Sequence, residues 1–386
     1  MSKKLIGLFL LIALSGIGVF ILLNQQTQQP TTSVIASLPV QSNDAFIKAM
    51  PGLVLEFPKD HGSHDEYQTE WWYLTGNLKA TDGQEFGYQL TFFRRGIQPM
   101  EVQFERTSDW ATEHIYLAHF TITNVEQNEF EFSERYSRGA AGLAGTKSTP
   151  FVEIWLEDWQ LTQLDENTFQ LNAREGDRGL NLILDDVKNP VLQGENGYSQ
   201  KGEGLGNASI YYSLPRLLTQ GQLTWQGQLF EVEGMSWMDH EFSTSALGQQ
   251  QIGWDWFAIH LSNGSDLMVY HIRNLDGSID QFSKGLLVFP DGSTQLLGKE
   301  DFSILSIDTW KSPYSGAEYP SEWKISIPDF DLNLTVKPLI NDQELNVSFL
   351  YWEGAVMAEG VVAGEAVEGR GYVELTGYAQ SMQGRF

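Results

Sequence analysis

The sequence predicts an all-β protein of two tandem antiparallel β-barrels, which arise from an internal duplication and follow an N-terminal membrane anchor or signal segment. Three observations carry this prediction. After Gly52, short stretches of alternating apolar and polar residues recur, rich in aromatic and β-branched side chains. Turn signals such as TDG, SNG and PDG separate them, and runs with helical spacing are scarce. Similar motifs also recur in the same order in both halves of the chain.

The N-terminal segment begins with Lys3 and Lys4, which precede an uncharged apolar run over residues 5–23. A helix of that length is roughly 28 Å long at about 1.5 Å per residue, close to the thickness of a bilayer core. The two lysines should stay in the cytoplasm while the rest of the chain is exported. No small-x-small cleavage site directly follows the run, which favours an anchor over a cleaved signal peptide. Residues 1–24 are therefore predicted to be an anchor or signal segment, and residues 25–51 a flexible linker.

The predicted strands are short and alternate in polarity. Examples are FGYQLTFF at 86–93, HIYLAHFTITNV at 114–125 and LNLILDDV at 180–187. Such strands separated by tight turns are typical of barrels and sandwiches. A barrel of about eight strands can hold one small ligand, and two adjacent barrels also form a crevice between them.

The internal repeat depends on three pairs of similar motifs that occur in the same order. The first pair combines two aromatic residues, an Asn-Gly or Asp-Gly turn and a strand that ends in Arg94 or Arg273. Three ordered pairs indicate a duplication with boundaries at residues 52–247 and 248–386. The pairs are 71–94 with 254–273, 211–223 with 351–362, and 234–241 with 371–378.

The composition excludes several classes of function. The 386 residues carry a formal net charge of -26, so nucleic acid is not an expected partner. The chain has no Cys, which excludes disulfides, thiolate metal sites and Cys nucleophiles. Neither a GxSxG elbow nor a P-loop occurs, and the Gly-rich stretch 202–210 leads into a strand rather than a helix.

The stretch GMSWMDHEFS contains three consecutive titratable residues, Asp239, His240 and Glu241. On a strand, Asp239 and Glu241 share one face, and His240 points to the other. Mutual repulsion beside an aromatic residue raises the pKa of one carboxyl, which suits a general acid. The alternative is that the two carboxylates cap a turn or pair with Arg216 or Arg273. We take Asp239, Glu241 and His240 as candidate catalytic residues.

The protonation of an alkene also needs an aromatic wall that stabilises the carbocation. Aromatic residues lie on both sides of the acidic stretch and in both halves of the chain. A cation close to them could instead pair with a carboxylate or bind an acidic ligand group. The candidate ligand-binding residues are Trp71, Trp72, Tyr211, Tyr212, Arg216, Trp237, Trp254, Trp256 and Tyr270.

A second polar segment, DHGSHDEYQTEWWY, contains His61 and His64 three residues apart, followed by Glu70. Histidines at this spacing in a Gly/Ser loop are weakly preorganised for a metal. A loop folded over a barrel mouth is the favoured interpretation, and Glu70 is expected to pair with an arginine. No metal and no cofactor are expected.

Six motifs together resemble one known family. They are FPKDHGSHDEYQTEWWYLTGNL, YYSLPRL, GMSWMDHEFS, GWDWFAIHLSNGSDLMVYHIR, YWEGAV and GYVELTGY. The set resembles the carotenoid 1,2-hydratases and AttH-like secreted lipocalin-like proteins over nearly all of the chain after Gly52. This resemblance implies two lipocalin-like barrels with a ligand site between or within them. It also implies water addition to a terminal alkene without a redox cofactor, or, in more distant relatives, pericyclic reactions of polyenes.

The chain departs from the hydratase pattern at two positions. The hydratases carry His-x-Trp and Tyr-x-Asp, whereas this chain has Phe242 after His240 and Ile272 after Tyr270. We therefore expect an exported protein that acts on an apolar polyene or lipid by cofactor-free acid catalysis, by hydration, isomerisation or cyclisation. The alternative is a non-catalytic lipocalin-like carrier of an apolar ligand in the periplasm. The inner membrane, reached through residues 1–24, is the other expected partner.

Overall fold

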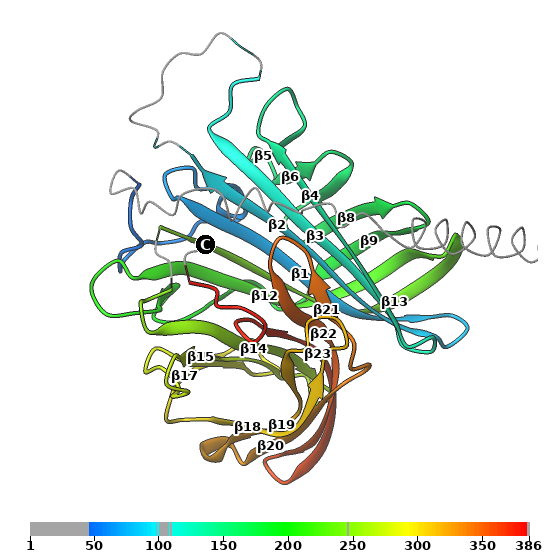
Figure 1. Ribbon diagram of the computed structural model, residues 1–386, viewed down its shortest axis with the longest axis vertical. Helices are drawn as coiled ribbons and strands as arrows, with labels where there is room; N and C mark the ends of the chain where they lie inside the picture. Colours follow the sequence, from blue (N-terminus) through cyan, green and yellow to red (C-terminus); the bar gives the residue numbers. More distant parts are fainter. Residues whose placement is uncertain (1–45, 98, 100–107, 109, 245–246, 384–386) are drawn as a thin grey trace, which may run out of the picture. The chain divides into compact units, whose positions relative to one another are not determined.

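Antiparallel strands make up nearly all of the regular structure in the computed structural model, which describes residues 46–97, 99, 108, 110–244 and 247–383 (Figure 1). Helical structure in these residues is confined to two short 3-10 turns, η1 (Lys59–His61) and η3 (Pro328–Phe330). The predicted anchor and most of the predicted linker lie outside the described residues. Within them, no helix is long and apolar enough to cross a membrane.

In the described part of the chain, two curled antiparallel sheets build the fold, the larger with 13 strands and the smaller with 10. The larger sheet contains β1 (Thr69–Ala80), β2 (Glu85–Gly96), β3 (His114–Asn124), β4 (Glu129–Arg138), β5 (Ala144–Lys147), β6 (Glu153–Leu156), β7 (Trp159–Gln163), β8 (Thr168–Glu175), β9 (Arg178–Asp186), β10 (Val191–Leu192), β11 (Tyr198–Gln200), β12 (Ala208–Trp225) and β13 (Gln228–Ser243). The smaller sheet contains β14 (Gln251–Leu261), β15 (Asp266–Asn274), β16 (Lys284–Val288), β17 (Thr294–Gly298), β18 (Ser303–Lys311), β19 (Glu318–Ile327), β20 (Leu332–Pro338), β21 (Glu344–Asn346), β22 (Leu350–Val362) and β23 (Glu365–Leu375).

The order of strands repeats between the two sheets. The larger sheet runs β4-β3-β2-β1-β13-β12-β9-β8-β7-β6-β5, and the smaller runs β17-β16-β15-β14-β23-β22-β20-β19-β18. In both, the first strand pairs with the last strand, and short strands add to the strand before the last. The predicted duplication of an all-β unit is confirmed. Both sheets are open, because no pairing joins β4 to β5 or β17 to β18 among the described residues.

The pairing registers correct one detail of the predicted repeat. Trp71 lies opposite Glu241 on β13, and Trp254 exchanges hydrogen bonds with Thr376 just after β23. Counting back from these partners pairs Gly234 with Gly369, two residues before the predicted partner Gly371. The same count places Asp239 and Glu374 at equivalent positions, because Asp239 faces Tyr73 and Glu374 faces Trp256.

Each curled sheet encloses its own apolar core, as the alternation of side chains along a strand requires. On β8, for example, Phe169, Leu171 and Ala173 are buried, while the intervening side chains are partly exposed. One core cluster is formed by the larger sheet and another by the smaller sheet.

Where the two sheets meet, strands are buried on both faces. The second half of β13, from Ser236 to Ser243, is buried at every position, whereas its first half alternates. A third cluster of aromatic residues fills this junction, with Tyr73 and Tyr211 from the larger sheet and Trp256 and Tyr372 from the smaller one. Polar side chains on this face are therefore largely buried by the opposite sheet.

Candidate functional site

The stretch GMSWMDHEFS lies on β13 and sends its side chains to two different places. Asp239 and Glu241 face the smaller sheet and line a cavity between the sheets. Met238 and His240 face the interior of the larger sheet, where Met238 belongs to the apolar core. The strand alternation predicted from the sequence is thus the observed one, and the three titratable groups do not act as one cluster.

The cavity and its opening together contain about 1150 Å³ of space that is free of protein atoms, and this volume includes open solvent. Its walls come from β1, β2, β12 and β13 of the larger sheet and from β14, β15, β22 and β23 of the smaller. Both halves of the duplication therefore contribute. The aromatic side chains of the lining are Trp71, Tyr73, Phe93, Tyr211, Trp254, Trp256, Tyr270 and Tyr351.

Asp239 is a buried carboxyl that is surrounded by neutral donors. The Tyr211 hydroxyl donates to its Oδ2 atom at 2.6 Å, and Trp237 Nε1 donates to its Oδ1 atom at 2.7 Å. The Ser213 hydroxyl also donates to Oδ1. Burial raises the pKa of Asp239 to about 7, although these hydrogen bonds lower it. At this pKa about half of the Asp239 side chains carry the proton at neutral pH, and three donors hold the carboxyl in one orientation.

Glu241, two residues further on the same face, has a charged partner. Lys201 Nζ lies 3.1 Å from its Oε1 atom. The same ammonium group lies 5.1 Å from the ring centre of Tyr211 and 4.6 Å from that of Tyr270. Two neighbouring carboxyls thus differ in their surroundings, since Glu241 is ion-paired and Asp239 is not.

Two further acids of the cavity were missed by the sequence analysis. Glu374 on β23 accepts a hydrogen bond from Trp254 Nε1 at 2.8 Å, and burial raises its pKa to about 7. Glu353 on β22 lies opposite Glu374 in the pairing register and is fully buried. Burial raises the pKa of Glu353 well above its ordinary value, and the charge of Glu374 adds to this effect. Both acids lie within motifs quoted for the repeat, so an alignment by strand pairing would have found them.

The predicted ligand-binding residues divide into two groups. Five of them line the cavity, and Trp237 is buried at its wall as a donor to Asp239. Trp72 and Tyr212 point into the larger sheet instead, as members of its core. Arg216 is also outside the cavity, because it pairs with Asp266 at 2.6 Å. The five lining residues are Trp71, Tyr211, Trp254, Trp256 and Tyr270.

The ion pairs expected for the acidic stretch have other partners. Arg273 pairs with Asp255 at 2.9 Å rather than with Asp239 or Glu241. Glu70 pairs with Arg94 at 2.8 Å, as predicted, and both side chains are fully buried. The cavity acids are therefore not part of an arginine network.

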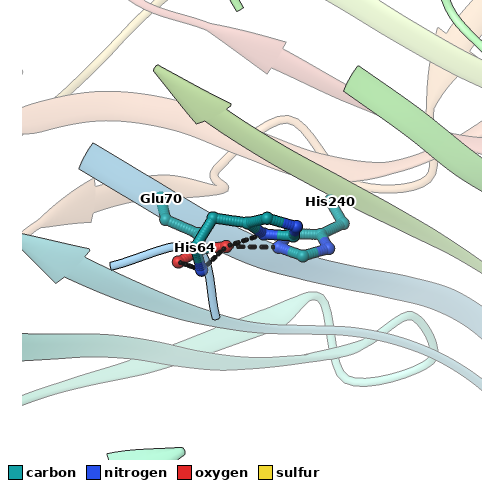
Figure 2. A group of neighbouring side chains, drawn as sticks. All are labelled: His64, Glu70 and His240. Atoms are coloured by element: carbon teal, nitrogen blue, oxygen red, sulfur yellow. Dashed lines mark hydrogen bonds and ion pairs between the residues drawn. The ribbon is translucent and has the colours of Figure 1, made fainter. Parts of the chain in front are cut away.

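Behind the cavity wall, His64, Glu70 and His240 form a buried polar cluster (Figure 2). His64 Nδ1 and His240 Nε2 each donate to Oε1 of Glu70 at 2.9 Å. His61 does not join them but bonds to the Tyr212 hydroxyl at 2.7 Å, and that hydroxyl also contacts His240 Nδ1 at 2.9 Å.

The three donor atoms of this cluster lie within 4.8 Å of one another, a spacing that could hold a metal ion. The charges around them favour an ion network instead. Arg94 already neutralises Glu70, and its charge together with hydrogen bonds from the two imidazoles holds the Glu70 pKa well below its usual range, against the effect of burial. His64 lies between Asp60 and Glu70, and these partners raise its pKa to about 9 despite burial. A metal cation would have to displace the proton of His64 and would be repelled by the positive charge of Arg94.

The sequence profile of the AttH-like family matches residues 48–378, which include every strand of both sheets. The chain belongs to the AttH-like family. An AttH protein of Nitrosomonas europaea is 33% identical, with a TM-score of 0.76 over 86% of this chain and 99% of the other. A comparison with curated proteins found no match.

Two more distant structures share the AttH-like fold. Kievitone hydratase of Nectria haematococca is 18% identical, with a TM-score of 0.64 over 86% of this chain and 94% of that enzyme. CghA, in a structure with Sch210972, is 11% identical, with a TM-score of 0.51 over 81% of this chain and 89% of the other. At these identities the likeness shows the fold alone.

Proposed function

We propose that this AttH-like protein is an enzyme that transfers a proton to a carbon–carbon double bond of an apolar polyene or lipid in the cavity between the sheets. The observation that carries the proposal is Asp239, a buried and oriented acid in a chamber with aromatic walls. A pKa near the working pH is what general acid catalysis needs.

The chemistry follows from these surroundings. The carboxyl proton of Asp239 moves to one alkene carbon as the π electron pair forms the new C–H bond, which leaves a carbocation and a carboxylate. The aromatic rings of Trp71 and Trp256, which line the cavity, stabilise the positive charge. Addition of water and loss of its proton give an alcohol, and loss of a neighbouring proton gives an isomer. Attack by a second double bond closes a ring and leaves a new carbocation, which becomes neutral by losing a neighbouring proton. In each case a proton returns to Asp239.

A second candidate function is that of a carrier for an apolar ligand. Ile272 favours this function, because it lines the cavity where the hydratases that the chain resembles carry an Asp. Phe242, which stands where the hydratases carry a Trp, does not contribute to the cavity. It is fully buried in the larger sheet and stacks on His64, with ring centres 3.7 Å apart. A carrier would bind the same ligands without transferring a proton.

The two functions are separated by incubating the protein with acyclic polyenes in D₂O and following deuterium incorporation by mass spectrometry. The wild type should incorporate deuterium, and Asp239→Asn should reduce the rate by about 100-fold or more. Asp186→Asn is the matched control, since burial also raises the pKa of Asp186, but that residue does not line the cavity. Binding without incorporation in the wild type would leave the carrier function standing.

We also propose that the protein lies on the outer face of the inner membrane, tethered by residues 5–23. The support is the uncharged run after Lys3 and Lys4. Cell fractionation should find the intact chain in the membrane fraction. Protease added to spheroplasts should then degrade it, because the bulk of the chain would lie outside the membrane. An intact cytosolic form would contradict export, and a shortened soluble periplasmic form would contradict only the tether.

A further inference from the structure

The charged groups of the cavity are strongly unbalanced. Its lining has four acids, Asp239, Glu241, Glu353 and Glu374, and Lys201 is the single lysine or arginine among the described lining residues. That lysine is already paired with Glu241 and lies over two tyrosine rings. A ligand with a negative group would meet no unpaired cation on these walls.

The inner part of the lining also has polar atoms without aligned partners. The hydroxyls of Tyr73 and Tyr351 lie close to the Glu353 carboxyl and lower its pKa by hydrogen bonding, but these hydrogen bonds are poorly aligned. The Tyr73 hydroxyl and the Gln89 Oε1 atom are likewise buried without a well-aligned partner. Glu353 and Gln89 are fully buried, and all three residues line the cavity from β22, β1 and β2. Buried polar atoms are nearly always paired, so this group points to a polar part of a ligand.

We propose that the cavity takes a polyene or lipid whose polar group is neutral or positively charged, and that it rejects the corresponding carboxylate. This inference rests on the proposed function for the location of the ligand, and it names the ligand's chemical class. A hydroxyl or carbonyl oxygen can accept a hydrogen bond from the protonated Glu353. A carboxylate at the same place would be a buried charge without a counterion, beside Glu374, whose pKa of about 7 leaves it partly ionised at neutral pH.

The same charge distribution favours a positive charge at the ligand. Aromatic faces attract cations, and acids that lie near neutrality in pKa can ionise when a cation approaches. An amine is then a stable analogue of the carbocation, and analogues of a transition state bind more tightly than substrates. The expected order of affinity is amine, then alcohol, then carboxylate.

Retinylamine, retinol and retinoic acid test this order, because they share one polyene chain and differ in charge. Their binding at about neutral pH is read from the quenching of tryptophan fluorescence. Retinoic acid should bind at least about tenfold more weakly than retinol, since a single uncompensated charge in a partly buried site is worth that much. Equal or tighter binding of retinoic acid would overturn the proposal.

Two substitutions sharpen the test. The double variant Glu353→Gln and Glu374→Gln keeps the shape of both side chains. It should raise the affinity for retinoic acid and lower the affinity for retinylamine by about tenfold each, and the affinity for retinol should change by less than about threefold. Glu374→Gln alone serves if the double variant does not fold, and half of each shift is then expected on a logarithmic scale. Lys201→Met should not lower the affinity for retinoic acid. A lower affinity would show instead that Lys201 binds the negative group of a ligand.

The outcomes separate this inference from the proposed function. If the affinities follow the expected order but no deuterium is incorporated, the proposed enzymatic function is contradicted and the proposed ligand class stands. Incorporation with a reversed charge order would do the opposite. If none of the three compounds binds, the cavity does not take an apolar polyene, and both proposals fall.

Discussion

Glu70 and Asp239 are both buried carboxyls on neighbouring strands of the same sheet, yet their protonation differs. Glu70 lies on the inner face of β1, with Arg94, His64 and His240 around it, and its pKa is well below its ordinary value. Asp239 lies on the outer face of β13, and burial raises its pKa to about 7. Because both groups are buried, their partners decide the outcome: Glu70 has two cations and a further N–H donor, and Asp239 has neutral donors.

This contrast divides the molecule into a stabilising face and a reactive face. The inner face holds a compensated ion network that joins the segment around His64 to the larger sheet. The outer face holds acids that the fold leaves uncompensated. Functional sites commonly keep such costly groups, and the rest of the structure compensates for them.

The largest expected effect comes from breaking the compensation of Glu70. Arg94→Met should lower the free energy of unfolding by about 3–5 kcal/mol, because it leaves the fully buried Glu70 with only His64 as a cation. Urea unfolding followed by circular dichroism measures this loss. Arg95→Met, at the next position on β2, is the control and should cost less than about 1 kcal/mol. Equal losses of unfolding free energy in the two variants would show that the ion pair of Arg94 with Glu70 contributes no more to stability than the neighbouring Arg95.

The pH dependence of stability should reveal Asp239. Its pKa rises from 3.8 in the unfolded chain to about 7 in the folded one, so the folded state binds the extra proton. Stability is therefore highest below about pH 4 as far as this group is concerned, and it falls by about 4 kcal/mol as the pH rises to about 7. Asp239→Asn should remove that fall. A variant with an unchanged stability profile over this range would show that Asp239 ionises normally.

His64 should produce a separate and somewhat smaller fall at higher pH. Its pKa rises from 6.5 to about 9, so its stabilising contribution is complete below about pH 6.5 and is lost as the pH passes through about 9. The expected loss is about 3 kcal/mol. Thermal melts of His64→Gln should lack this loss but keep the one from Asp239. If both falls disappear together, the two faces are coupled and the comparison fails.

The smallest effect comes from two adjacent tyrosines on opposite faces of β12. Tyr212→Phe should cost about 1 kcal/mol of stability, since its hydroxyl bonds to His61 and His240, and it should leave proton transfer unchanged. Tyr211→Phe should change stability less but raise the pKa of Asp239, because its hydrogen bond favours the ionised carboxyl. The pH–rate profile of deuterium incorporation would then shift to higher pH. A shift of the pH–rate profile in the Tyr212 variant instead would show that the assignment of the two tyrosines to the reactive and the stabilising face is wrong.

The sequence determined the fold class, the duplication and the face of Asp239, because alternation and ordered motifs are local signals. The same alternation could have separated Trp71 from Trp72 and Tyr211 from Tyr212, since neighbours on a strand point to opposite faces. Arg216 was not predictable in this way, because it lies at a register shift between Leu214 and Leu217. Glu374 could be placed only from the strand pairing, because residue similarity had shifted the third motif by two positions. Glu353 lies in the second motif, and the pairing register then places it opposite Glu374.

The protonation state of Asp239 is the central claim, and infrared difference spectroscopy measures it directly. Spectra of the wild type and of Asp239→Asn are compared between about pH 5 and pH 9, with the C=O stretch of a protonated carboxyl as the signal. We predict that the wild type shows protonated carboxyls that titrate near pH 7, from Asp239 and Glu374, and that Asp239→Asn loses the part of this signal that belongs to Asp239 while the part from Glu374 remains. Identical titrations in the two proteins would show that Asp239 is ionised throughout, and it could not then be the acid of the site.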